Sequence, residues 1–123
     1  MLVDAIDHVQ LAMPPEGEAQ ARTFYSGVLG IPEVPKPQAL SERSGCWFES
    51  GALRVHLGVE SGFRAARKAH PAFVTPDFDA LVRALHDTGC ECKGAESLHG
   101  RRRAFTHDPF GNRIELIEAA VSA

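Results

Sequence analysis

Four side chains in this sequence have the chemistry needed to hold a divalent transition metal. They are His8, His56, His70 and Glu115. Each lies in a stretch that alternates polar and apolar residues, so its side chain should leave a strand on the face opposite the core. Imidazole nitrogens and a carboxylate suit such an ion without any thiolate. Taken singly, each histidine is more often structural, and Glu115 is more often a solvated residue on a half-exposed strand.

The positions of these side chains repeat between the two halves of the chain. His8 and Arg54–Leu57 in the first half correspond to His70 and Arg113–Leu116 in the second. This correspondence aligns His56 with Glu115. An internal repeat determines the architecture, because two equivalent units place equivalent residues on equivalent strands. If a pseudo-twofold axis relates the units, all four side chains should converge on one concave face.

The elements that must position these residues occur in the same order in both halves. In the first half we expect a strand over Val3–Met13 and a helix over Gly17–Leu29, capped at its C-terminus by Gly30. A hairpin should follow, with strands Gly45–Ser50 and Ala52–Val59. The first module should therefore span about residues 1–62 and the second about residues 63–123, within one domain.

The second half should begin after a polar and basic connector. The expected elements are a connector over Glu60–Ala69, a strand over Ala69–Thr75, a helix opened by Pro76 and ended by Gly89, a strand over Cys90–Lys93, a loop over Leu98–Arg102 and a final hairpin over Phe105–Glu118. The hairpin turn is predicted at Asp108–Asn112, where Pro, Gly and Asn favour a tight reversal. Glu115 then lies between two core residues and faces away from them.

Composition and charge exclude several classes of function. The chain has 123 residues, 44% hydrophobic residues and a net charge of -3, so neither nucleic acid nor a membrane surface is expected as a partner. There is no signal-peptide pattern and no apolar run of membrane-spanning length. The three cysteines show no disulfide framework, which favours a reducing cytoplasm.

Five stretches resemble the vicinal oxygen chelate superfamily, which includes glyoxalase I, bleomycin-resistance proteins and extradiol dioxygenases. These stretches are IDHVQLAM, FYSGVLG, RVHLGVE, KAHPAFVT and DPFGNRIELIE. The resemblance implies an α+β fold of two βαβββ modules, related by a pseudo-twofold axis, whose mixed sheets curl around a concave metal site. In much of this superfamily two subunits complete each other's sites, so the resemblance also implies a homodimer. If the modules instead pair within one chain, the four ligands can still meet without exchange between subunits.

Carried over residue by residue, the resemblance implies metal ligands at His8, His70 and Glu115. The fourth position is Glu in glyoxalase I and His56 here, which puts the glyoxalase I reaction in doubt. Fosfomycin-resistance enzymes usually carry Thr where this chain has Gln10. Bleomycin-resistance proteins lack the metal ligands that this chain retains.

The expected function is therefore that of a metal-dependent enzyme acting on a small oxygen-chelating molecule, of the glyoxalase-like lyase, epimerase or thiol transferase class. One divalent ion, Zn, Ni, Mn or Fe, is implied. Glu115 or His56 is the expected proton acceptor, with Glu49 and His107 as weaker candidates. The residues expected to contact substrate are Gln10, Trp47, Arg103 and Arg113. The alternative is a metal-free binding or sequestration protein of the bleomycin-resistance type.

Overall fold

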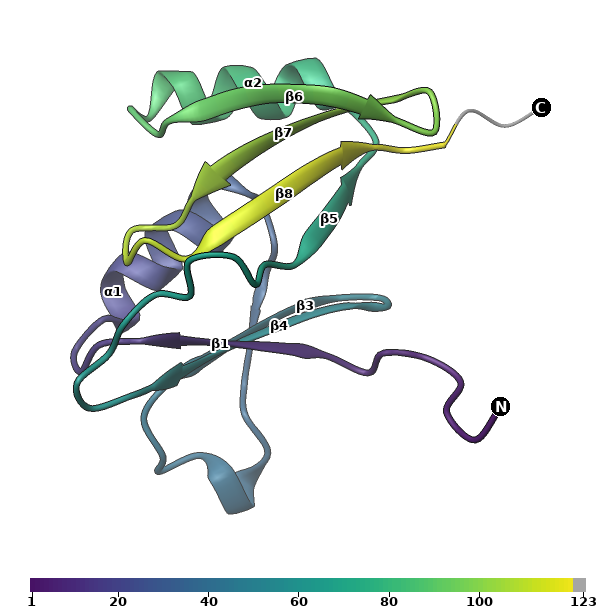
Figure 1. The fold of residues 1–123 in the computed structure, drawn as a ribbon. Helices are drawn as coiled ribbons and strands as arrows, with labels where there is room; N and C mark the ends of the chain where they lie inside the picture. The colour runs from purple at the N-terminus through teal and green to yellow at the C-terminus, as the bar shows by residue number, and fades with distance from the viewer. Residues whose placement is uncertain (121–123) are drawn as a thin grey trace. The chain divides into compact units, whose positions relative to one another are not determined.

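The computed structural model describes residues 1–120, and these form two compact units (Figure 1). Module 1 runs from Met1 to Arg64, and module 2 begins at Ala65. Each module contains one four-stranded mixed sheet and one main helix. No helix within residues 1–120 is long and apolar enough to cross a membrane.

Module 1 is built on strands joined in the order β1-β4-β3-β2. Its elements are β1 (Val9–Met13), α1 (Glu18–Ala21), the π-helical segment η1 (Arg22–Val28), β2 (Glu33–Val34), the 3-10 turn η2 (Gln38–Leu40), β3 (Cys46–Ser50) and β4 (Leu53–Val59). β1 pairs with β4 in parallel, and the other pairs are antiparallel. A βαβββ unit is therefore present in the first half.

Module 2 repeats this order as β5-β8-β7-β6. Its elements are β5 (Ala72–Thr75), α2 (Phe78–Asp87), β6 (Cys92–Leu98), β7 (Arg101–His107) and β8 (Arg113–Glu118). β5 pairs with β8 in parallel, while β6, β7 and β8 form an antiparallel meander. The predicted architecture of two βαβββ modules is confirmed.

The strand registers of the two modules also match. Gln10 pairs with His56 in module 1, and Ala72 pairs with Glu115 in module 2. The residue two places before each first-strand partner is a histidine, His8 or His70. The inner hairpins agree as well, because Trp47 faces His56 and Phe105 faces Glu115. Equivalent positions thus carry the four candidate ligands.

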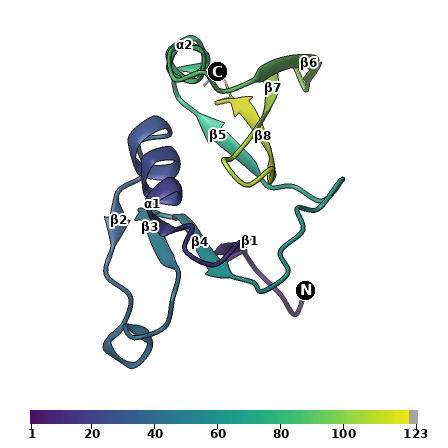
Figure 2. The same ribbon diagram turned by 90° about the vertical axis from the view of Figure 1, so that its left-hand side faces the viewer.

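Each sheet buries one face against its own helix. In module 1, Phe48, Val55 and Leu57 are buried on this face, and Tyr25 of η1 stacks on Phe48 with ring centroids 5.5 Å apart. In module 2 the corresponding core contains Leu85, Ile114 and Leu116. Figure 2 shows α2 nearly end-on, lying over one face of the module 2 sheet. Alternation along β4 and β8 then directs the candidate ligands to the opposite face.

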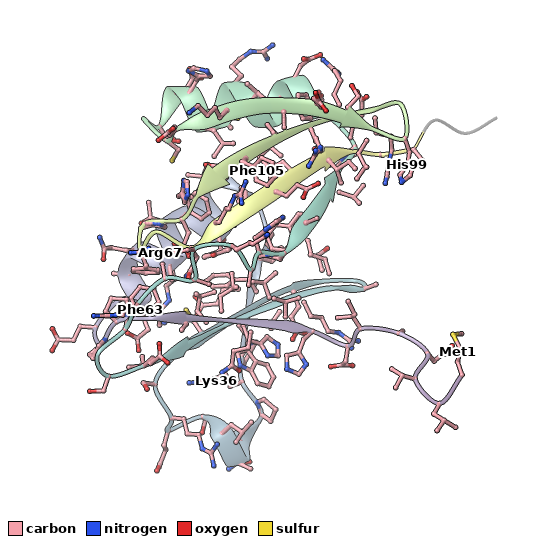
Figure 3. All side chains as sticks on the ribbon, viewed as in Figure 1. Met1, Lys36, Phe63, Arg67, His99 and Phe105 are labelled. Atoms are coloured by element: carbon pink, nitrogen blue, oxygen red, sulfur yellow. The ribbon has the colours of Figure 1, made fainter. Side chains whose placement is uncertain are left out.

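Four strand predictions were wrong by more than one residue. β5 begins at Ala72 rather than Ala69, and β7 begins at Arg101 rather than Phe105. β1 begins at Val9 rather than Val3, and β6 continues to Leu98, so that the loop expected from Leu98 is a tight turn before β7. The register explains the short β1: Val9 pairs with Val55, and β4 begins only two residues earlier, so earlier residues have no strand to join. Met1 lies at the far end of this exposed N-terminal segment (Figure 3).

Candidate functional site

The module 2 site is a histidine and a glutamate that approach each other directly. Glu115 lies on β8, and its backbone N–H donates to the Pro71 carbonyl at 3.0 Å, which brings the chain before β5 alongside. His70 Nε2 then lies 3.0 Å from Glu115 Oε1. The Glu115 residue is only 7% exposed, so it is not the solvated strand glutamate that the hairpin alone would suggest. Burial arises because both faces of β8 are covered.

Hydrogen bonding decides which nitrogen of His70 carries a hydrogen. Nδ1 lies 2.7 Å from the Lys68 carbonyl oxygen, which can only accept, so Nδ1 donates. In the neutral ring Nε2 therefore has a lone pair, and it faces a carboxylate oxygen that also has lone pairs. Two acceptors at this distance require a proton or a cation between them. A backbone-anchored imidazole beside a carboxylate is a donor set that fits a divalent metal.

An aromatic ring and two arginines surround this pair. Phe105, whose position on β7 is labelled in Figure 3, packs edge-on against the His70 ring with centroids 5.3 Å apart. The Arg113 guanidinium lies 4.1 Å from the Phe105 ring centroid. Arg103 Nη1 lies 3.6 Å from Glu115 Oε2, while its Nε donates to the Glu96 carbonyl at 2.6 Å. Positive charge therefore borders the carboxylate on the β7 side.

The module 1 site is a stack of three rings around His56. This residue is 5% exposed and lies between the two strands that flank β4. Its ring is parallel to that of Trp47 on β3, with centroids 3.8 Å apart and an interplanar angle of 2°. The ring of His8, directly before β1, stacks at 4.5 Å and 22°. His8, His56 and Trp47 therefore lie together within module 1.

Two carboxylates hold the histidines of this stack. His56 Nε2 donates to Glu49 Oε2 at 2.7 Å, and His8 Nδ1 donates to Asp7 Oδ2 at 2.9 Å. Asp7 also accepts from Arg54 Nη1 at 2.7 Å. The hydrogen bond from His8 and the nearby Arg54 charge lower the pKa of Asp7, which stays ionised. His8 is thereby held with its hydrogen on Nδ1 and a lone pair on Nε2 in the neutral ring, as His70 is in module 2.

Gln10 lies beside His56 on the same face of the sheet, because the two are register partners. It is exposed, and its amide crosses Gly58, where a Cβ would lie 2.6 Å from Gln10 Nε2. The missing side chain at Gly58 therefore makes room for Gln10. Its predicted contact with substrate is untested by this geometry.

The structure groups the predicted residues within modules. His8, His56 and Trp47 meet in module 1, as do His70, Glu115 and Arg103 in module 2. Among residues 1–120, no group of three or more His, Cys, Asp or Glu side chains is arranged so that it could hold a metal ion. Convergence of the two pairs on one ion therefore stays a prediction.

Two neighbours of the site were not singled out from the sequence. Asp7 precedes His8 directly, so its adjacency was a usable signal for an anchoring partner. Phe105 faces Glu115 across the hairpin, as Trp47 faces His56, and pairing the strands outward from the turn would have found it.

Comparison with known proteins identifies the family. Residues 5–116 match the family model of the Glyoxalase/Bleomycin resistance protein/Dioxygenase superfamily. A glyoxalase family protein from Bacillus anthracis is 42% identical, with a TM-score of 0.90 over 96% of this chain and 97% of that one. A search of curated proteins found no match.

More distant structures share the fold. A glyoxalase/dioxygenase from Nostoc punctiforme is 20% identical with a TM-score of 0.78, covering 95% of this chain and 92% of its own. A genomically encoded fosfomycin resistance protein from Listeria monocytogenes is 15% identical with a TM-score of 0.75, covering 97% and 96%. The sequence match, the module topology and these structures agree: the chain belongs to the glyoxalase/bleomycin resistance protein/dioxygenase superfamily, the vicinal oxygen chelate group.

Proposed function

We propose that this protein is a metal-dependent enzyme of the vicinal oxygen chelate type that acts on a small oxygen-chelating molecule. Its reaction would be of the glyoxalase-like lyase, epimerase or thiol transferase class. The observation that carries the proposal is the approach of His70 Nε2 to Oε1 of the buried Glu115 at 3.0 Å. With Nδ1 committed to the Lys68 carbonyl, this pair presents two adjacent lone-pair donors with no ring hydrogen between them in the neutral state.

The residues that would hold the metal are His8, His70 and Glu115, with His56 as the fourth. His8 and His70 each have Nδ1 anchored by an acceptor, an arrangement that orients metal-binding histidines and fixes their tautomer. A bound divalent ion would act as a Lewis acid toward oxygen atoms of the substrate. Nitrogen and carboxylate donors are compatible with Zn, Ni, Mn and Fe.

The remaining residues have roles that follow from their positions. Glu115 or His56 would accept a proton from the substrate, since both lie buried at equivalent sheet positions. Arg103 and Arg113 would bind anionic groups of the substrate, and Arg103 Nη1 lies 3.6 Å from Glu115 Oε2. Trp47 and Gln10 lie on the same face as His56 and would contact the body of the substrate.

A metal-free binding protein is the second candidate, and one observation favours it. His56 Nε2 is already hydrogen-bonded to Glu49, and the ring is stacked between two others, as in a packed aromatic wall. Such a wall suits the binding of a flat organic molecule. On this account the protein would sequester its ligand without a reaction.

We further propose that both modules form a single functional domain in a cytoplasmic homodimer. The net charge of -3 supports a small-molecule partner rather than nucleic acid. Twofold dimers are the commonest assemblies of soluble proteins. Light scattering at micromolar concentration should give twice the chain mass, and a monomer would contradict the dimer.

The experiment is calorimetric titration of untagged protein with Zn²⁺, Ni²⁺ and Mn²⁺. We expect tight binding of at least one ion, and a loss of roughly 100-fold or more in Glu115→Gln and His8→Ala, because removal of a ligand costs more than removal of a supporting residue. Glu118→Gln is the control, since this β8 glutamate pairs with Arg102 instead. If the unaltered protein binds no ion more tightly than the two ligand variants, the binding-protein candidate replaces the enzyme.

A further inference from the structure

We propose that Glu49 is a positioning residue that fixes the His56 ring with its hydrogen on Nε2, so that Nδ1 is the nitrogen offered to a metal or substrate. The role of Glu49 toward a metal rests on the proposed function. The tautomer that Glu49 imposes on His56 is a property of the metal-free protein. Glu49 belongs to β3, whereas all four predicted ligands lie on or before the parallel-paired strands.

The strand register brings Glu49 to this position. Trp47 is the direct partner of His56 and Glu49 is the partner of Arg54, so Glu49 is the diagonal neighbour of His56 on the same face. The distance from Glu49 Oε2 to His56 Nε2 is 2.7 Å. The side chains are 25% and 6% exposed, so this hydrogen bond is largely shielded from water. A carboxylate oxygen accepts, and Nε2 must therefore carry the hydrogen.

Ring stacking fixes the plane of the His56 ring, and the hydrogen bond to Glu49 selects one of the two orientations within that plane. Trp47 covers one face of the ring and His8 lies against it from the β1 side. Turning the ring over would move Nε2 away from Glu49 and leave a shielded carboxylate without its donor, which costs more than an ordinary lost hydrogen bond. Among residues 1–120, Nε2 is the ring nitrogen of His56 that has a hydrogen-bond partner. Nδ1 is thus the available lone pair.

The carboxylate beside the site comes from a different strand in module 2. There the last strand itself supplies a carboxylate, Glu115, and the equivalent of Glu49 on β7 is the exposed His107. Module 1 has His56 on the last strand and draws its carboxylate from the neighbouring strand. His8 and His70 would therefore offer Nε2, whereas His56 would offer Nδ1.

The direct test is the tautomer of His56 in metal-free protein, read from long-range ¹H–¹⁵N correlation spectra and assigned with a His56→Gln variant. The unaltered protein should show the hydrogen on Nε2 of His56. Glu49→Ala should convert the ring to a mixture of tautomers, and Glu49→Gln should largely preserve it, because the amide oxygen still accepts. His107→Ala, at the equivalent place in module 2, should leave the His56 signals unchanged. A hydrogen on Nδ1, or no change in Glu49→Ala, would overturn the proposal.

Calorimetric titration with Zn²⁺ separates this inference from the proposed function. Glu49→Ala should weaken Zn²⁺ binding by roughly 10–100-fold, as loss of a supporting carboxylate does elsewhere, with Glu49→Gln intermediate and His107→Ala unchanged. If the unaltered protein binds Zn²⁺ and Glu49→Ala binds it equally well, Glu49 has no positioning role toward the metal. If the unaltered protein binds no metal, the metal proposal fails, and the tautomer spectra alone decide whether Glu49 positions His56.

Discussion

The two modules share strand order and register but hold their polar residues by different means. In module 2, His70 meets Glu115 directly and the backbone carbonyl of Lys68 fixes the imidazole. In module 1 the equivalent residues are two stacked histidines, each fixed by a side-chain carboxylate. The repeated fold therefore places the candidate ligands at equivalent positions. The residues around each ligand then determine which nitrogen or oxygen atom could bind a metal or substrate.

The helices of the modules differ in the same way. α2 is regular and begins at a side-chain cap, in which Asp77 accepts from the Ala80 N–H at 3.1 Å. The module 1 helix has Gly17 at this place, without a side-chain cap, and it widens into a π-helical segment in which Leu29 N–H donates to the Phe24 carbonyl. The module 1 helix therefore lacks both the side-chain cap and the regular hydrogen bonding of α2.

The largest difference in stability between matched variants of the two modules should appear at glycine positions. Gly45 has φ +101°, and a Cβ there would overlap the Leu57 carbonyl oxygen, so Gly45→Ala should lower the free energy of unfolding by at least about 1–3 kcal/mol. Gly94→Ala in module 2 is the matched control, because no atom lies within 4 Å of its Cβ position. Urea denaturation measures both. Equal effects of the two variants would contradict the account of Gly45.

A smaller effect is expected at the helix cap. Asp77→Ala removes the acceptor for the Ala80 N–H and should cost about 1 kcal/mol of unfolding free energy. Asp87→Ala, at the last residue of α2, should not destabilise, because a negative charge there is unfavourable to the helix dipole. Thermal or urea unfolding that shows no loss for Asp77→Ala would mean that the cap adds nothing to α2.

The smallest effect concerns acid stability. The Gly45 N–H donates to Glu18 and lowers the pKa of that carboxyl, so Glu18 stabilises the fold above its unfolded pKa of about 4.3 and loses this contribution as pH falls through the lower folded value. The advantage of the unaltered protein over Glu18→Gln should be below about 1 kcal/mol at pH 7 and should vanish in acid. An advantage independent of pH would contradict this.

High salt should distinguish the effect of Glu18→Gln on unfolding from the effect of Glu118→Gln in module 2. There, hydrogen bonds and charge from Arg102 lower the pKa of Glu118 and Asp79, and all three side chains are at the surface. The effect of Glu118→Gln on unfolding should therefore shrink in high salt. The effect of Glu18→Gln should change less, because its partner is a backbone N–H.

Strand alternation and turn residues were sufficient to predict most of the fold. The turn at Asp108–Asn112, the glycines that end both helices and the repeat were all visible as local signals. β2 was missed because its two residues stand between prolines, and the end of β6 was missed because a bulge between Ala95 and Leu98 interrupts its alternation. The length of β1 depends on where β4 begins, which is information from another part of the chain.

The sheet positions of the candidate site residues could be predicted from the sequence, but their side-chain contacts could not. Alternation placed His56 and Glu115 on the polar face of their sheets, and equivalent registers bear this out. The diagonal contact of Glu49 with His56, the Lys68 carbonyl and the stacking of Trp47 depend on side-chain rotamers and on the chain before each strand. Alternation carries no information about these.

The central proposal, which the structure leaves untested, is that one metal ion takes ligands from both sequence repeats, and metal stoichiometry tests it most directly. Protein dialysed against Zn²⁺ should retain one ion per chain by mass spectrometry. His8→Ala in module 1 and His70→Ala in module 2 should each abolish retention, whereas His107→Ala should not. Retention of two ions per chain, of none, or of one ion that only a single module's histidine affects would contradict a site shared between the modules.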